Sequence, residues 1–151
     1  MRIQYYCGEV DAEMMALLLS ADPDEAAVLT YIETAKIIVA LIADKVIAIA
    51  VVTVDGTESE IKNIAVAVAY QGQGIAKSLI ASAKNVAKES AATSLIVGTG
   101  NSSLSQLALY QKCGFRLFKI IPDFFADYPE AIFENGIRCI DMLVLKVELG
   151  E

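Results

Sequence analysis

The sequence predicts a single α/β domain, residues 1–151, built around a mixed sheet. Three observations lead to this prediction. At 151 residues, 56% of them hydrophobic, the chain has the size of one domain and enough apolar side chains for one core. Strand-like and helix-like segments follow in the order strand, two helices, three strands, helix, strand, helix, two strands. The sequence contains no linker, internal repeat or low-complexity segment that would divide it.

Periodicity and capping residues place a strand and two helices in the first part of the chain. Residues 2–7 alternate weakly, which is typical of a strand. Residues 11–19 carry apolar side chains at helical spacing. The segment Asp22-Pro23-Asp24-Glu25 predicts the start of a second helix, because it combines an acidic cap, an early proline and carboxylates at the positive helix end. We expect that helix to end near Thr34.

Three strands follow, and the first two form one long apolar stretch. The stretch resembles a membrane span, but Asp44-Lys45 lies in its middle, and each charge would cost roughly 2.5–3.5 kcal/mol at the centre of a bilayer. Two buried strands, residues 36–43 and 46–54, joined by a tight turn explain the Ile and Val content better. The turn dipeptide Asp55-Gly56 then leads into a third strand, residues 60–68.

The second half begins with a long amphipathic helix. Apolar residues from Ile75 to Ala87 recur every three or four positions, with lysines and a serine on the other side, which indicates one buried face. Gly114 stands where a left-handed residue would end a later helix. The expected elements are a helix from residue 75 to about 88, a strand at 94–99, a helix at 102–113, a strand at 115–121, an aromatic-rich loop at 122–136 and a last strand at 138–147.

Charge and residue usage exclude several functions. Twelve basic and nineteen acidic residues give a net charge of −7, which argues against nucleic acid as a partner. The absence of histidine excludes His-based triads, Cys–His dyads and His-containing zinc sites, and we expect no metal. Cys7, Cys113 and Cys139 form neither a C-x-x-C pair nor a complete disulfide framework, and no signal-like segment opens the sequence. We therefore expect a cytoplasmic protein without membrane association.

A glycine-containing loop joins the third of these strands to the long helix. Such a loop leaves backbone N–H groups pointing at one spot beside the positive end of the helix, and this arrangement binds phosphates. A dinucleotide fingerprint requires a small residue where Lys77 stands, and a P-loop requires glycine at Gln71 and at Ala76, so both patterns fail. What remains is Gln-x-x-Gly-x-Ala. A plain strand-to-helix connection is the alternative.

Two motifs together resemble the GNAT (Gcn5-related N-acetyltransferase) superfamily. Asn63-Ile64-Ala65-Val66 followed by Gln-x-x-Gly-x-Ala is similar to its pyrophosphate-binding motif. Tyr110-Gln111-Lys112-Cys113-Gly114-Phe115 is similar to its later Tyr-x-Lys-x-Gly-Phe signature. The resemblance covers the chain closely from about residue 37 onward. It implies a mostly antiparallel mixed sheet flanked by helices, acetyl-CoA as the donor, and transfer of its acetyl group to a primary amine.

The resemblance also implies roles for individual residues. Glu60 stands where many relatives keep a catalytic glutamate, and period-two counting puts it on the same strand face as Ile64; a solvated strand-edge carboxylate is the alternative. Tyr110 matches the tyrosine that donates a proton or hydrogen bond to the CoA thiolate, or it packs on the core. The expected CoA contacts are the backbone of Ile64, Ala65 and Val66, the diphosphate loop Gln71, Gly72, Gln73, Gly74, Ile75, Ala76 and Lys77, and Asn101 or Ser103 in place of a family asparagine.

The acceptor and two rival functions remain open at this point. Residues 123–130 combine aromatic rings with carboxylates, which suits a cationic or aromatic amine but also suits a loop that covers the end of the sheet. Small amines, antibiotics and protein N-termini or lysines all remain candidate acceptors. A non-catalytic acyl-CoA sensor would keep the phosphate loop, and a structural protein would bind no CoA. An exposed strand would allow two copies to pair as a homodimer.

Overall fold

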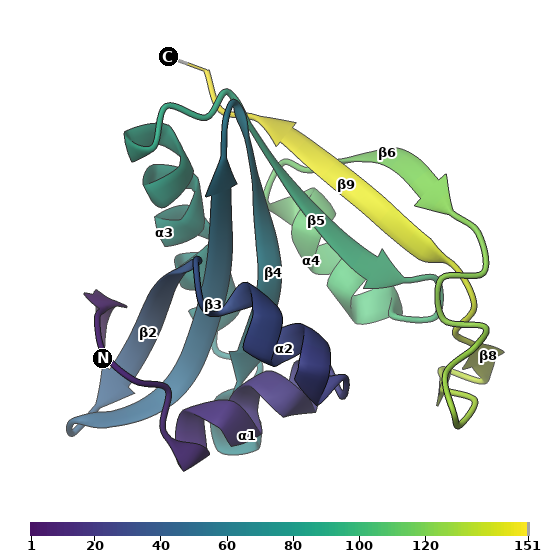
Figure 1. Ribbon diagram of the computed structural model, residues 1–151, viewed down its shortest axis with the longest axis horizontal. Helices are drawn as coiled ribbons and strands as arrows, with labels where there is room; N and C mark the ends of the chain where they lie inside the picture. Colours follow the sequence, from purple (N-terminus) through teal and green to yellow (C-terminus); the bar gives the residue numbers. More distant parts are fainter. Residues whose placement is uncertain (151) are drawn as a thin grey trace.

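The computed structural model describes residues 1–150, which form a seven-stranded sheet with the order β1-β2-β3-β4-β5-β9-β6 (Figure 1). Only β4 and β5 run parallel, and the other neighbours in the sheet are antiparallel. The predicted mixed, mostly antiparallel sheet is therefore confirmed. The strands of this sheet are β1 (Arg2–Tyr6), β2 (Lys36–Ile42), β3 (Lys45–Asp55), β4 (Glu58–Val66), β5 (Ser94–Gly100), β6 (Arg116–Ile121) and β9 (Met142–Glu148).

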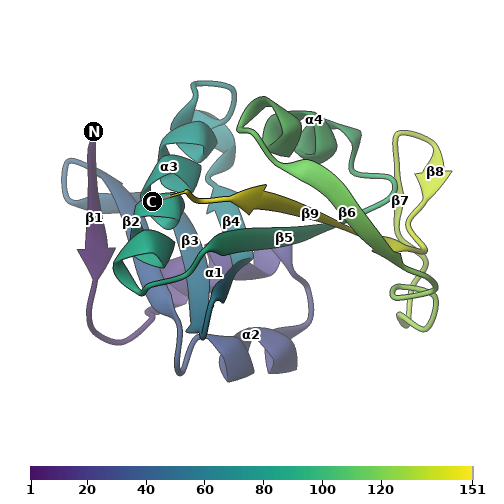
Figure 2. The same ribbon diagram turned by 90° about the horizontal axis from the view of Figure 1, so that it is seen from above.

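Helices cover both faces of the sheet. Helices α1 (Ala12–Ala21) and α2 (Glu25–Tyr31) lie on one face, and α3 (Ile75–Glu89) and α4 (Leu104–Lys112) lie on the other (Figure 2). Asp11 caps α1 by accepting from the Met14 amide at 2.9 Å. The second helix starts within the predicted segment, but its cap is Asp24, which accepts from the Ala27 amide at 3.2 Å, so Pro23 precedes the helix instead of lying in its first turn. Helix α2 ends at Tyr31 rather than near Thr34, because the chain turns there to enter β2.

Strands β2 and β3 are buried on both faces, which explains their unbroken runs of Ile, Val and Ala. Alternate side chains pack under α1 and α2 or under α3, so the sheet separates two hydrophobic cores. Ala43 and Asp44, with φ of 50° and 65°, form the tight turn between β2 and β3. No helix within residues 1–150 combines the length and the apolar character that crossing a bilayer requires.

Strand β4 contains a bulge that sequence periodicity did not reveal. Val51 pairs with Asn63, whereas the next residue of β3, Val52, pairs with Ile61. Lys62 is therefore an extra residue on β4, and the alternation of side chains between the two faces is reversed beyond it.

This reversal corrects the predicted position of Glu60. Ile61 and Ile64 pack in the same core, under α3, although period-two counting puts them on opposite faces. Glu60, one residue before Ile61, therefore points to the opposite face from Ile64. The prediction that Glu60 and Ile64 share a face is wrong. Strand β4 also begins and ends two residues earlier than predicted, so Glu60 is its third residue.

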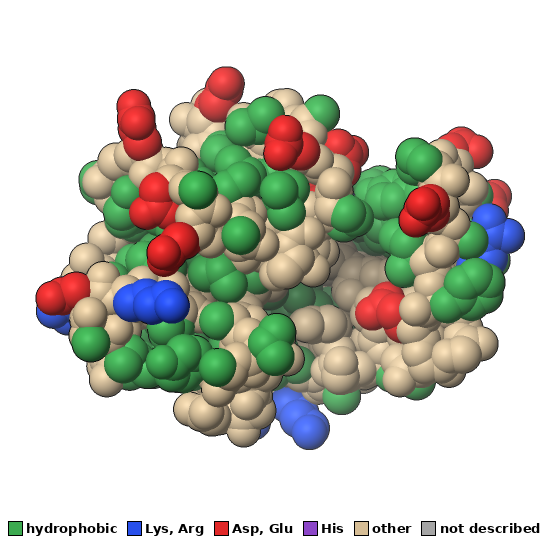
Figure 3. Space-filling model, turned by 90° about the horizontal axis from the view of Figure 1, so that it is seen from below, with side chains coloured by type: hydrophobic (Ala, Val, Ile, Leu, Met, Phe, Trp, Pro, Cys, Tyr) green, Lys and Arg blue, Asp and Glu red, His purple; other side chains and the backbone are tan. Residues whose placement is uncertain are grey.

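Strands β4 and β5 separate after a short parallel pairing. Residues 58–61 pair with residues 94–97, and beyond these pairs the two strands diverge (Figure 1). Within residues 1–150, the edge of β4 that faces β5 has no strand partner at residues 62–66. The space-filling view shows a hollow on the face of the molecule that is seen from below (Figure 3).

The segment between β6 and β9 is more ordered than the predicted loop. Strands β7 (Phe133–Glu134) and β8 (Ile137–Arg138) form a separate two-stranded hairpin. The last strand of the main sheet accordingly begins at Met142 rather than at residue 138.

Candidate active site

The glycine loop between β4 and α3 presents an open concave backbone. It follows a short 3₁₀ turn, η1 (Val68–Tyr70). Gly72 and Gly74 have φ of 78° and 82°, a left-handed conformation that other residues rarely adopt. Nothing lies within 4 Å of the position that a Cβ would occupy on either glycine. Gln71 donates from Nε2 to the carbonyl oxygen of Val66 at 3.0 Å, which ties the loop to the end of β4.

The charges at the start of α3 favour an external anion. Helix N-termini commonly carry Asp or Glu, which stabilise the positive end of the helix dipole. The first turn of α3 has no acidic residue, and Lys77 lies within it. The first amides of α3, residues 75–77, have no acceptor within the helix. This arrangement suits a bound phosphate group.

The unpaired edge of β4 leads directly into this loop. On one side, Ile64, Ala65 and Val66 pair with β3. On the side facing β5 their backbone groups are free of strand pairing, as described above. An extended ligand that carries amide groups fits such an edge as an added strand.

Tyr110 projects from α4 into the core under α3. Its exposed fraction is 3%, and its ring lies 5.9 Å from that of Phe115, measured between centroids. Burial raises the pKa of the Tyr110 hydroxyl well above 10, and the nearby Cys113 raises it further.

The end of α4 is held by a lysine from α3. Gly114 ends α4 with φ of 94°, as predicted for a helix terminus. Lys84 donates from Nζ to the carbonyl oxygen of Cys113 at 2.6 Å and lies 5.7 Å from the centroid of the Phe115 ring. These contacts fix the segment that carries Tyr110.

Glu60 lies in a depression of about 440 Å³ near the point where β4 and β5 part. The residues around it include Thr34, Glu58 and Ile96. The Glu60 carboxylate forms an ion pair with Lys62 at 3.2 Å, and its side chain is 30% exposed. It is therefore accessible to water.

Asn101 and Ser103 bind the β7–β8 hairpin region. Asn101 Oδ1 accepts from the amides of Ile140 and Asp141 at 2.8 and 3.0 Å, while its Nδ2 donates to the carbonyl oxygen of Arg138 at 3.1 Å. The Asn101 carboxamide thus uses both its donor and its acceptor within the protein. Ser103 donates from Oγ to Glu134 at 2.8 Å and keeps acceptor capacity on its oxygen.

A buried polar network on the other face of β4 was missed by sequence analysis. Asn63 donates from Nδ2 to the carbonyl oxygen of Leu18 and to the hydroxyl of Tyr31, both at 2.9 Å. The Tyr31 hydroxyl in turn donates to Asp22 Oδ2 at 3.1 Å. An asparagine within the apolar sequence of β4 was the one available signal, because a buried amide requires partners.

Comparison with known proteins decides the family. The family model described as an acetyltransferase (GNAT) domain matches residues 33–117. The chain belongs to the GNAT acetyltransferase family. The predicted family resemblance is confirmed by this match and by relatives that align along nearly the whole chain.

Three relatives illustrate the similarity of this acetyltransferase to others. An uncharacterized N-acetyltransferase of Bacillus subtilis, YvbK, is 43% identical over 143 residues, which cover 93% of this chain and 92% of the relative. The structure of an IAA acetyltransferase from Bacillus cereus is 46% identical, with a TM-score of 0.91 and coverage of 97% of this chain and 98% of that one. A GNAT acetyltransferase from Elizabethkingia anophelis with acetyl-CoA bound is 40% identical, with a TM-score of 0.91 and 97% coverage of both chains.

The acetyltransferase thus brings some of the predicted site residues together and separates others. The free edge of β4 is continuous with the glycine loop, and Ile64 and Tyr110 belong to the same core. Glu60 lies on the opposite face of β4 from Ile64. Asn101 lies immediately after the end of β5, across the gap that separates β5 from the end of β4.

Proposed function

We propose that this acetyltransferase transfers the acetyl group of acetyl-CoA to a primary amine. The observation that carries the proposal is the continuity between the unpaired edge of β4 and the open glycine loop at the start of α3. Acetyl-CoA has an extended arm with two amide groups next to a diphosphate, so one molecule would occupy both features. The acetyl-CoA bound to the Elizabethkingia relative supports this assignment.

In the proposed binding mode, the backbone of Ile64, Ala65 and Val66 pairs with the pantetheine arm. The amides from Gly72 to Lys77 hold the diphosphate, and the Lys77 side chain adds a positive charge. Ser103 is the better candidate for a further CoA contact, because the Asn101 carboxamide already has partners for both of its ends.

The reaction follows from this placement. The neutral amine nitrogen attacks the thioester carbon, a C–N bond forms, the C–S bond breaks, and the products are an N-acetylated amine and CoA. A backbone N–H near Val66 would polarise the thioester carbonyl. Positioning of the two substrates provides much of the rate.

Two side chains are assigned to the proton transfers. Glu60 accepts the proton that the amine loses, through a water molecule, since its carboxylate is accessible to solvent and faces away from Ile64. Tyr110 donates a proton to the departing thiolate. Its hydroxyl is protonated at neutral pH and can also act as a hydrogen-bond donor to the thiolate, while the pKa that burial raises makes it a weaker acid.

The test combines a binding measurement with a turnover measurement. Calorimetric titration with acetyl-CoA reports binding, and release of free thiol across a panel of amines reports transfer. We expect Glu60→Gln and Tyr110→Phe to bind acetyl-CoA normally and to lose kcat by about a hundredfold and about tenfold.

Glu58→Gln is the matched control for Glu60→Gln. Glu58 is on the same strand and lines the same depression, but it pairs with Lys146, at 3.9 Å, instead of Lys62. The control should keep the activity of the unmodified protein. Full activity in Glu60→Gln and Tyr110→Phe would show that the assigned roles are wrong, and acetyl-CoA binding without thiol release from any amine would favour a sensor.

A further inference from the structure

One edge of the main sheet exposes apolar side chains on a strand with a free side. Strand β6 is last in the strand order, and within residues 1–150 it pairs only with β9. Leu117, Phe118 and Ile120 on this strand are 61%, 54% and 62% exposed. The unpaired backbone groups of such an edge are a template for another strand. The chain therefore leaves an apolar strand open at the opposite end of the sheet from β1.

A bulge in β6 gathers two of these apolar residues on one face. Leu117 pairs with Leu145 of β9. Ile120 pairs with Leu143, two residues earlier on β9. Because alternate residues of β9 share a face, their partners Leu117 and Ile120 share one as well, although they are three residues apart. Phe118 is the extra residue that shifts the alternation.

The two cations of β6 lie on its other face. Arg116 pairs with Lys146 of β9, and Lys119 pairs with Val144. Charged side chains on an edge strand commonly prevent pairing with another chain. Here the bulge separates them from the apolar pair, so the face that carries Leu117 and Ile120 has no charge on β6.

The sequence of β6 is complementary to itself in an antiparallel pair. When two copies of residues 116–121 overlap fully, Leu117 of each copy lies opposite Ile120 of the other, which forms one apolar stripe across the two-fold axis. In the same register Lys119 lies opposite Phe118, so like charges do not face each other. The Phe118 ring already attracts a lysine within one chain, because Lys146 Nζ lies 4.7 Å from its centroid.

The residues at the two ends of β6 have opposite charges. Arg116 and the exposed Asp123 form no ion pair among residues 1–150. In an antiparallel pair the start of one strand lies beside the end of the other, so Arg116 of each copy comes next to Asp123 of the other. A depression of about 480 Å³ lies at the start of β6, lined in part by Gly114 and Val147. The residues after Asp123, including Phe124, which is 46% exposed, come beside this depression.

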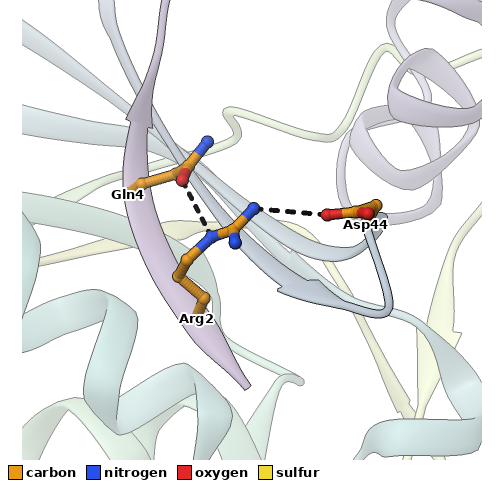
Figure 4. Close-up of polar contacts among 3 residues, drawn as sticks. All are labelled: Arg2, Gln4 and Asp44. Atoms are coloured by element: carbon orange, nitrogen blue, oxygen red, sulfur yellow. Dashed lines mark hydrogen bonds and ion pairs between the residues drawn. The ribbon is translucent and has the colours of Figure 1, made fainter.

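The opposite edge of the sheet uses its polar groups within the chain. At the start of β1, Arg2 pairs with Asp44 at 3.4 Å and also donates to Gln4 (Figure 4). The hydroxyl of Tyr5 donates to the carboxylate of Glu89. These groups of β1 are thus occupied within one chain, whereas Arg116 and Asp123 are left for a second one.

We infer that the partner of β6 is a second copy of this chain, paired with it strand to strand across a two-fold axis. The two sheets join into one, with the apolar stripe of Leu117 and Ile120 at the junction and a contact between Arg116 and Asp123 at each end of the shared strands. Strands β9 and β5 separate β6 from β4, so the unpaired edge of β4 and the glycine loop stay open in the dimer. The inference is therefore independent of the proposed acetyl transfer.

The test measures the mass of the protein in solution by analytical ultracentrifugation over a range of concentrations. The unmodified protein should have twice the 16.2 kDa of one chain. Ile120→Lys should raise the dissociation constant of the dimer about a hundredfold, because a lysine would enter the apolar stripe. Tyr5→Lys is the matched control, since Tyr5 is 53% exposed on the other edge strand. It places the same charge on β1 and should leave the dimer intact.

Asp123→Asn tests the charge pairs at the ends of the strands. Asparagine tolerates the positive φ of 59° at this position. The variant should raise the dissociation constant of the dimer about threefold, and its difference from the unmodified protein should disappear in about 1 M salt. Asp44→Asn, at a φ of 65°, removes the same charge from an ion pair within one chain and should leave the dissociation constant unchanged.

Hydrogen exchange distinguishes loss of pairing from loss of folding. In the dimer the amides of β6 that point away from β9 should be protected, and Ile120→Lys should expose them while the amides of β9 stay protected. A monomeric unmodified protein, or a dimer that Ile120→Lys leaves unchanged, would overturn the inference. Dissociation by Tyr5→Lys alone would assign the interface to β1 and overturn it as well. Asp123→Asn gives an independent result if Ile120→Lys unfolds the sheet.

Discussion

The Nδ2 of Asn63, which directly follows the bulge residue Lys62 on β4, donates to the hydroxyl of Tyr31 on α2 at 2.9 Å. The same hydroxyl donates to Asp22 at the end of α1, so one tyrosine connects both N-terminal helices to the sheet. The network therefore links α1 and α2 to β4 and contributes to the stability of the fold.

Tyr31→Phe should lower the free energy of unfolding by about 1–2 kcal/mol. The ring remains, but Asn63 and Asp22 each lose one hydrogen bond. Urea unfolding at neutral pH measures the change, and an unaltered m-value is expected because the exposed surface is the same. A loss below about 0.3 kcal/mol would mean that the network contributes little to stability.

Tyr110→Phe should change the pH dependence of stability. Burial raises the pKa of Tyr110 above its ordinary value of 10, so the folded protein holds this proton more tightly than the unfolded chain. The resulting stability is fully present below pH 10 and is lost as the pH rises above it. The variant should lack this loss, which approaches about 1.4 kcal/mol per pH unit for one group.

The comparison requires urea unfolding of both proteins on each side of pH 10, so that the other titrating groups cancel. Near neutral pH the free energies of unfolding of the two proteins should agree within about 0.5 kcal/mol, because phenylalanine keeps the packing of the ring against Phe115. Parallel stability curves above pH 10 would contradict the raised pKa.

Gly74→Ala should weaken acetyl-CoA binding about tenfold, because a methyl group would stand on the concave backbone that a diphosphate approaches. Alanine at the positive φ of residue 74 should also lower the free energy of unfolding by about 1–2 kcal/mol. Gly56→Ala is the control, since Gly56 has φ of 64° and similarly open surroundings but lies in the β3–β4 turn. Calorimetry should show a normal Kd for the control; a normal Kd for Gly74→Ala would place the diphosphate elsewhere.

Asn101→Ala should reduce stability by about 2–3 kcal/mol, because three hydrogen bonds that hold the segment before β9 are lost. Asn101→Asp keeps the two hydrogen bonds that Oδ1 accepts and loses the one that Nδ2 donates, so its free energy of unfolding should fall by about 1 kcal/mol. Both changes are measured by chemical unfolding. The Kd of Asn101→Asp for acetyl-CoA should stay within about twofold of the unmodified value, whereas a larger increase would assign Asn101 a direct cofactor contact.

The sequence by itself determined the family, the order of the elements and the glycine loop. The family follows from the resemblance of two short motifs, Gln71–Ala76 and Tyr110–Phe115. The elements and the loop follow from local properties: hydrophobic periodicity, an acidic helix start at residues 22–25, and the glycines whose positive φ allows the turn at Gly72 and Gly74. Each of these local signals can be read within a window of a few residues. The helices and strands that they predict lie close to their predicted positions in the structure.

The tertiary structure decided which residues share a face and which polar groups are already paired. The extra residue at Lys62 depends on how β3 and β4 pair, so period-two counting placed Glu60 and Ile64 on one face when they lie on opposite faces. The partners of Asn101 come from about 40 residues further along the chain, and those of Asn63 from α1 and α2. Contacts between distant segments leave no periodic signal in the sequence, so the polar networks around the candidate site became visible only in the folded chain.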